Sequence, residues 1–204
     1  VEAHAAEGRR TTVPRAEPTP QPGPTRRAAA LLRYPAGLAL SAARYARWSS
    51  RVERTEQAGD DGDLPPELPQ RFLDAHVKTI EDGSGPLLHR TFRVRIRDGD
   101  TDAVTLMTKV TANLGRAAPS EVTSFRKSRG RLGRLAPGDE YVVQMPAPWN
   151  GPVRVIHQGA TSFRLATLTR HLEAGQIEFA IHDVDGGLEF SIETWSRPGD
   201  HVSM

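Results

Sequence analysis

The sequence contains no cysteine, which excludes disulfide bonds, thiolate catalysis and zinc sites of the cysteine type. It also lacks the uninterrupted run of ~18–20 apolar residues that a membrane-spanning helix needs, because Arg33 and Pro35 interrupt its most apolar N-terminal stretch. Only Lys78, Lys109 and Lys127 are lysines, so 24 of the 27 basic residues are arginine. Arginine suits phosphate binding, but coding bias in a GC-rich genome explains the same excess, and we favour that explanation. The absence of cysteine permits a cytoplasmic location.

The formal net charge of +2 conceals an asymmetry along the chain. Residues 1–57 hold ten basic and five acidic residues, whereas the remainder holds 17 basic and 20 acidic ones. The basic charge therefore lies in the N-terminal arm, and the rest of the chain is mildly acidic.

Composition divides the chain into four segments. Residues 1–25 carry five prolines and no apolar periodicity, which predicts a disordered arm. Residues 26–57 are rich in alanine and arginine and predict a basic helical segment. Residues 58–86 are acidic and proline-rich, which predicts a linker with a short helical piece. Residues 87–204 predict one α+β domain.

The basic helical segment has two interpretations. As an amphipathic helix, residues 26–51 could lie on a membrane surface and place Tyr45 and Trp48 at the interface. The alternative, which we favour, is a helix that docks on the folded domain.

The α+β domain is predicted to hold a curved antiparallel sheet of about six strands, with two helices inserted after the first strand. Asn150-Gly151 and Asp185-Gly186-Gly187 are typical of tight turns between strands. The predicted elements are a strand at 88–97, helices at 101–114 and 119–125, and strands at 140–146, 153–157, 162–168, 176–182 and 188–195.

Alternation along the last strands indicates that the sheet has one buried and one wet face. Ile177, Phe179 and Ile181 point to one side, whereas Glu178 and His182 point to the other. An apolar sheet face has to be covered, so the identity of the covering layer is the functional question. The order of elements is that of the helix-grip or START-like fold, in which a curved sheet wraps a C-terminal helix around a cavity.

Four segments of the sequence resemble one protein family, and they are Gly138-Asp-Glu-Tyr-Val-Val, Pro146-Ala-Pro-Trp-Asn-Gly-Pro-Val-Arg-Val, Thr161-Ser-Phe-Arg-Leu-Ala-Thr-Leu and His171-Leu-Glu-Ala-Gly-Gln-Ile-Glu-Phe. The family is the domain of unknown function catalogued as 1990, with bacterial and plant members. By analogy the resemblance implies the helix-grip layout. It also implies a C-terminal helix beyond Asp200, whereas the sequence ends at Met204. Either the sequence is a fragment or this helix is missing, and residues 26–48 could then occupy the groove.

An apolar pocket under the sheet is the favoured functional site, because ligand sites are concave and mostly apolar with few polar groups. Its predicted lining is Tyr141, Val143, Phe163, Phe179, Phe190 and Ile192. A connection between strands offers a polar mouth, or alternatively a turn that caps the sheet, at Arg170, His171 and Glu173. The sequence thus predicts a noncatalytic domain that binds a small hydrophobic ligand or lipid without a cofactor.

Other functions stay open. An enzyme of the same architecture would use Glu178, His182 or Glu193 inside the pocket. A membrane-surface or protein-interaction module would use the basic arm. The run Arg126–Arg134 could hold a phosphate or a nucleic-acid backbone. It lacks the aromatic platform that binds single strands, so we expect a solvated loop and no nucleic acid. The seven histidines show no metal-ligand spacing, which predicts no metal site.

Overall fold

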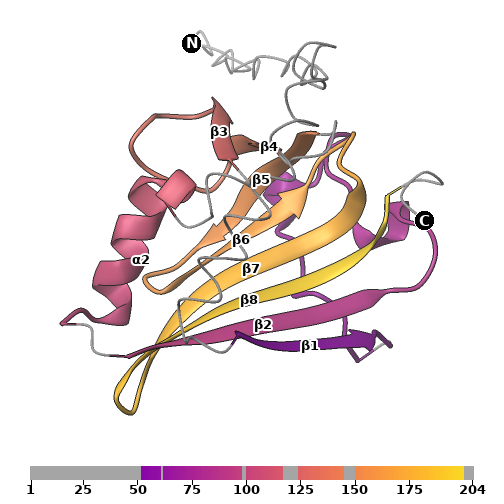
Figure 1. Cartoon of the computed structure of the whole chain (residues 1–204). Coiled ribbons are helices and arrows are strands. Elements are labelled where there is room, and N and C mark those ends of the chain that lie inside the picture. The colour runs from indigo at the N-terminus through magenta and orange to yellow at the C-terminus, as the bar shows by residue number, and fades with distance from the viewer. Residues whose placement is uncertain (1–51, 61, 98–99, 117–123, 145–149, 200–204) are drawn as a thin grey trace, which may run out of the picture.

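A single antiparallel sheet dominates the computed structural model, which describes residues 52–60, 62–97, 100–116, 124–144 and 150–199 (Figure 1). The eight strands follow the order β1-β2-β8-β7-β6-β5-β4-β3. The architecture is α+β, as predicted, but with eight strands rather than six. Their bounds are β1 (Val52–Ala58), β2 (Leu88–Arg97), β3 (Ser124–Arg129), β4 (Glu140–Gln144), β5 (Asn150–Gln158), β6 (Ser162–Thr167), β7 (Glu173–Val184) and β8 (Gly187–Pro198). The predicted arm at 1–25 and residues 26–51 lie outside the described residues.

Strand pairing assigns each strand residue to one of two faces. Phe179 pairs with Phe163 on β6 and with Ile192 on β8, so these three side chains share one face. We call it the inner face, and its neighbours in register include Phe92, Val94, Tyr141, Leu165, Ile177, Ile181, Leu188 and Phe190. The opposite face is the outer face. The period-two alternation of the sequence therefore gives the inner face its apolar surface.

The helix α2 (Ala103–Ala112) packs on the inner face. Asp102 caps it, since its Oδ1 accepts a hydrogen bond of 2.7 Å from the Thr105 amide, which satisfies one of the unpaired donors of the first turn. A second carboxylate, Asp183 on β7, accepts a hydrogen bond of 3.1 Å from the Ala103 amide. The hydrogen bond between Asp183 and Ala103 therefore holds the first turn of α2 on the sheet. In the described part of the chain, no helix is long and apolar enough to cross a membrane.

Two helical predictions are wrong. Ser124–Arg129, at the end of the predicted helix 119–125, forms the edge strand β3, because Phe125 pairs with Val143 and joins the apolar inner face. Residues 119–123 lie outside the described residues. The helical segment predicted at 26–57 ends in a strand instead, because Val52–Ala58 forms β1, which pairs along its whole length with β2. Backbone pairing with an available sheet edge outweighs the helical propensity of these residues.

The two predicted hairpin turns have different outcomes. Gly186 adopts a φ of 78° between β7 and β8, where a tight turn favours glycine, so the second prediction is confirmed. Asn150 and Gly151 instead lie inside β5, paired with Gln144 and Val143. Asn150 is buried, and this pairing holds the dipeptide extended.

The predicted linker at 58–86 packs on the outer face. Leu68 and Val77 form a second apolar cluster with Ile156, Ala166 and Leu168 of the sheet, and Phe72 packs against it. The segment contains the short 3-10 helices η1 (Gln70–Phe72) and η2 (Ile80–Asp82), and a third, η3 (Leu114–Arg116), follows α2.

The buried Arg154 fastens this segment to the outer face. Its guanidinium donates hydrogen bonds of 2.8 Å to Glu140, 2.7 Å to Asp74 and 3.2 Å to the Phe72 carbonyl oxygen. Burial alone would lower the pKa of Arg154, but the two carboxylates outweigh it and raise the pKa. Residues 58–86 are therefore an integral part of the domain rather than a linker.

Candidate ligand-binding face

The structure places all six predicted pocket residues on the inner face. Tyr141 and Val143 come from β4, Phe163 from β6, and the other three from β7 and β8. The Phe163 and Phe179 rings stack, with centroids 4.8 Å apart and an interplanar angle of 13°. The Phe179 and Phe190 centroids are 6.4 Å apart. These aromatic contacts add to the energy of simple burial and make a continuous apolar surface across three strands.

One half of the inner face is closed by the chain itself. Ala103 and Met107 of α2 pack on it together with Leu114 and Leu135, and all four are buried. Beneath them Tyr141 and Phe163 are only 6% and 1% exposed. These two predicted lining residues therefore belong to the closed core and form the floor of the site rather than its surface.

The other half of the inner face is only half-buried. Phe92, Ile192 and Phe179 stand directly beside one another on β2, β8 and β7, and Val94 and Phe190 form the next row. All five side chains are of intermediate exposure. Five neighbouring apolar side chains that keep contact with solvent form the kind of patch that marks a binding surface. We call these five residues the apolar row.

Phe92 was missing from the predicted pocket. Its own strand showed the alternation, with Val94 and Ile96 on the same side. The missing information was the pairing of β2 with β8, which puts Phe92 beside Ile192 although the two are far apart in sequence.

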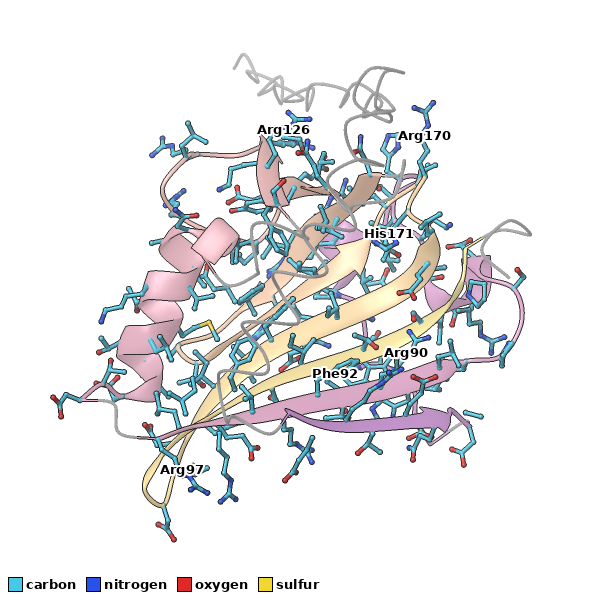
Figure 2. The ribbon with its side chains drawn as sticks, viewed as in Figure 1. Arg90, Phe92, Arg97, Arg126, Arg170 and His171 are labelled. Carbon is cyan, nitrogen blue, oxygen red and sulfur yellow. The ribbon has the colours of Figure 1, made fainter. Side chains whose placement is uncertain are left out.

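A polar edge borders the apolar row at one end. Arg90 lies beside Phe92 over β2 and β8 (Figure 2), and its guanidinium makes ion pairs of 3.4 Å with Glu56 and 3.3 Å with Glu173. A hydrogen bond from Arg54 is the main cause of the lowered pKa of Glu56. Thr194 is the register partner of Arg90. Its hydroxyl oxygen is buried and has no hydrogen-bond partner among the described residues.

The predicted polar mouth is brought together in part. His171 Nδ1 lies 3.0 Å from the Glu173 amide nitrogen and 3.1 Å from the Glu173 carbonyl oxygen, and burial lowers the pKa of His171. The Lys78 ammonium donates a hydrogen bond of 3.0 Å to the carbonyl oxygen of His171. His171 is thus a neutral, internally bonded side chain. Glu173 reaches Arg90 at the polar edge, whereas Arg170 is exposed, has a φ of 77° and points away from the sheet (Figure 2).

The far end of the inner face is hollowed at the turn between β7 and β8. A crevice of about 240 Å³ lies there. Its walls are residues 95–97 of β2 and residues 184–188 of the hairpin, including Ile96 and Leu188 of the inner face. The half-buried surface therefore extends from the polar edge at Arg90 to this crevice.

The carboxylates and histidine proposed for an enzyme lie on the outer face. Glu178 and Glu193 are register partners there, and His182 follows on the same side of β7. Glu178 makes an ion pair of 3.3 Å with Arg164, and Glu193 lies 2.8 Å from His89 Nε2. The expectation that one of the three points into the pocket is wrong, because the alternation that turns Phe179 inward turns them outward. In the described part of the chain, no three His, Asp or Glu residues are grouped closely enough to hold a metal ion.

Comparison with known proteins identifies the family. The model of the domain of unknown function DUF1990 matches residues 88–204. The chain belongs to this family. A search of curated proteins finds no match. Two solved structures are similar: CalU16 from Micromonospora echinospora, with 11% identity, a TM-score of 0.40 and coverage of 72% of this chain and 71% of CalU16, and Ara h 8.0201, with 13% identity, a TM-score of 0.38 and coverage of 55% and 80%.

The region matched by DUF1990 contains most of the candidate site. It runs from the first residue of β2 through β8 and includes α2, so the whole apolar row and the Arg90–Glu173 ion pair lie inside it. Glu56 on β1 and the segment that covers the outer face precede it. The apolar row therefore lies within the matched region, whereas β1 at the edge of the sheet lies outside it.

Proposed function

We propose that this protein binds a small hydrophobic ligand or lipid, without catalysis, on the apolar row of the inner face. The observation that carries the proposal is that three members of the apolar row, Phe92, Ile192 and Phe179, lie side by side on three paired strands and stay half-buried. A folded domain gains ~25 cal/mol for each Å² of apolar surface removed from water. A ligand that covers these side chains supplies that gain, and the rigid sheet beneath them requires little rearrangement.

The polar edge indicates an amphiphilic ligand with a hydrogen-bonding group at one end. A buried hydroxyl without a hydrogen-bond partner costs ~1–3 kcal/mol. The Thr194 hydroxyl, next to the apolar row, is buried and has no such partner among the described residues. A ligand hydroxyl or carboxyl oxygen placed there would satisfy it. Arg90 stands at the adjacent position and offers guanidinium donors, although Glu56 and Glu173 already neutralise its charge. The geometry thus favours a ligand whose head group is held by hydrogen bonds more than by net charge.

The first experiment is native mass spectrometry of the gently purified full chain. We expect a stoichiometric apolar adduct, which denaturing analysis then assigns to a ligand class. Binding is measured with the fluorescent probe anilinonaphthalene sulfonate.

A matched pair of variants locates the site on one face. Phe92→Lys places a charge in the apolar row, whereas Thr91→Lys places the same charge one residue earlier on the outer face, opposite Glu193. We expect Phe92→Lys to abolish probe binding and Thr91→Lys to retain it. Equal affinities of the two variants, with both folded by circular dichroism, would reject the inner face as the site.

Thr194→Val tests the polar edge separately, because it removes the hydroxyl and keeps the shape. We expect unchanged or higher stability and a loss of roughly fivefold in affinity for an amphiphile with a hydroxyl head group, the effect of one hydrogen bond of ~1 kcal/mol. An unchanged affinity would show that the head group binds elsewhere.

A further inference from the structure

The run Arg126–Arg134, which we call the basic loop, begins on the edge strand β3 and continues beyond its end at Arg129. Leu132 near its tip is 85% exposed, more than any other large apolar side chain of the described residues. Arg131 and Arg134 flank it and are exposed as well. An isolated exposed leucine is ordinary. Leu132 is of interest only if the backbone of the loop holds it in a defined exposed position.

An internal cation holds the basic loop in shape. The Lys127 ammonium donates a hydrogen bond of 2.6 Å to the carbonyl oxygen of Arg131 and another to that of Arg134. It also pairs with Asp139 at 2.7 Å. The Lys127 side chain is 6% exposed, so one of the five charges expected on a solvated loop is instead used inside it. Because the carbonyl groups of the loop turn inward to Lys127, its tip is a built feature with a defined shape.

Two further positions restrict the loop. Gly130 has a φ of +107°, and a Cβ atom there would lie 1.8 Å from Asp139 Oδ1, so the chain can pass this point only as glycine. Leu135 at the base is buried in the main core. The loop is therefore anchored at its base and keeps Leu132 outside without support from neighbouring apolar groups.

The positive charge around the tip is not neutralised locally. Arg126, Arg131 and Arg134 form no ion pair with any described residue, and Figure 2 shows Arg126 on the edge strand β3. The nearby carboxylates belong to other cations, since Asp139 pairs with Lys127 and Glu140 with the buried Arg154. The exposed Leu132 therefore lies in the sequence between Arg131 and Arg134, whose guanidinium groups are exposed and form no ion pair with a described residue.

We propose that the basic loop docks this protein on an anionic membrane surface, with Leu132 in the interfacial region and the arginines on lipid phosphates. The membrane interface offers hydrocarbon and phosphate within a few ångströms of each other, which matches an exposed leucine between two exposed arginines. A nucleic acid matches less well, because the loop has no aromatic side chain on which bases could stack. The proposal does not rest on the ligand site of the inner face.

The test is co-sedimentation of the full chain with vesicles of phosphatidylcholine alone and of phosphatidylcholine mixed with phosphatidylserine, at low and at physiological salt. We expect binding only to the mixed vesicles, weakened by salt. Arg131→Gln and Arg134→Gln should each lower the affinity roughly fivefold, and Leu132→Ser should lower it further. Leu64→Ser and Arg71→Gln change exposed side chains of the segment that covers the outer face, so they are matched controls and should bind as the wild type does.

A variant that gains a signal on binding distinguishes loss of vesicle binding from loss of folding. Leu132→Trp places an indole at the exposed tip, where no packing is disturbed, and its fluorescence should shift to the blue on binding the mixed vesicles. Absence of vesicle binding overturns the proposal, and so does binding that the loop variants leave unchanged, which would assign it to residues 1–51. Binding to heparin that equals vesicle binding and does not need Leu132 also overturns it, in favour of a soluble polyanion.

Discussion

Replacing Lys127 by methionine should lower the free energy of unfolding by about 3 kcal/mol. The substitution keeps the aliphatic part of the side chain and removes the ammonium, which leaves the Asp139 carboxylate without its ion-pair partner at 10% side-chain exposure. Breaking a buried pair by removing one partner costs ~3–5 kcal/mol. We place the cost at the lower end because Asp139 retains a 2.9 Å hydrogen bond from the Ala136 amide. The carbonyl groups of Arg131 and Arg134 can turn to water, so they add little.

The protonation state supports this magnitude at neutral pH. Burial alone would lower the pKa of Lys127, but the hydrogen bond to Asp139, the contact with Tyr141 and the charge of Asp139 together outweigh burial and raise it. A raised pKa means that the pair contributes its full stability below the unfolded value of ~10.4 and loses it as the pH rises through the folded value. The difference between wild type and Lys127→Met should accordingly be constant around pH 7 and shrink only in strong alkali.

Urea unfolding followed by far-ultraviolet circular dichroism measures the effect. Lys109→Met is the matched control, since Lys109 is exposed on α2, and it should change the stability by less than ~0.5 kcal/mol. The double variant Lys127→Met/Asp139→Asn should recover part of the loss, because the asparagine oxygen can still accept the Ala136 amide. A cost for Lys127→Met no larger than that of Lys109→Met would refute the interpretation of Lys127 as the internal cation of the basic loop.

Two further predictions concern the sheet. His89 Nδ1 lies 2.9 Å from Asp63 and Nε2 lies 2.8 Å from Glu193; burial alone would lower the pKa of His89, but these carboxylates raise it. The destabilisation by His89→Gln should therefore be largest near pH ~5–6.5 and fade as the pH rises through the folded pKa. Urea unfolding of both proteins across this pH range measures the difference. A difference that grows with pH would contradict the prediction. Phe163→Ala should cost about 3–5 kcal/mol, whereas Phe179→Ala, half-buried, should cost at most about 2 kcal/mol; equal costs in thermal unfolding would mean that both rings lie in one closed core.

The sequence predicts local features of the fold where a single strand carries the whole signal. The strict alternation around Phe179 and Phe190 defines which side of β7 and β8 is apolar without knowledge of any partner strand. The turn at Gly186 follows equally from local chemistry, since a positive φ favours glycine. Such features are decided within ten residues of chain, which is the range over which periodicity can be read.

Features that depend on distant partners could not be predicted. β1 has only Val52 and Ala58, its two end residues, as apolar side chains, and it is a strand because β2 offers it an unpaired edge. Arg154 looks like any surface arginine until Asp74 and Glu140, 80 and 14 residues away, are placed around it. Phe92 enters the candidate site for the same reason, through the β2–β8 pairing. The candidate site is therefore predicted only in the part that comes from consecutive strands.

The order of the strands separates the two proposed surfaces. The apolar row lies on β2, β8 and β7, whereas the basic loop leaves β3 at the far edge, with β4, β5 and β6 between them. Substitutions at sites without shared contacts act independently. Leu132→Ser should thus leave probe binding unchanged, and Phe92→Lys should leave vesicle binding unchanged. If Phe92→Lys weakened vesicle binding as strongly as Leu132→Ser does, the apolar row itself would be the membrane contact, because three strands separate the two surfaces.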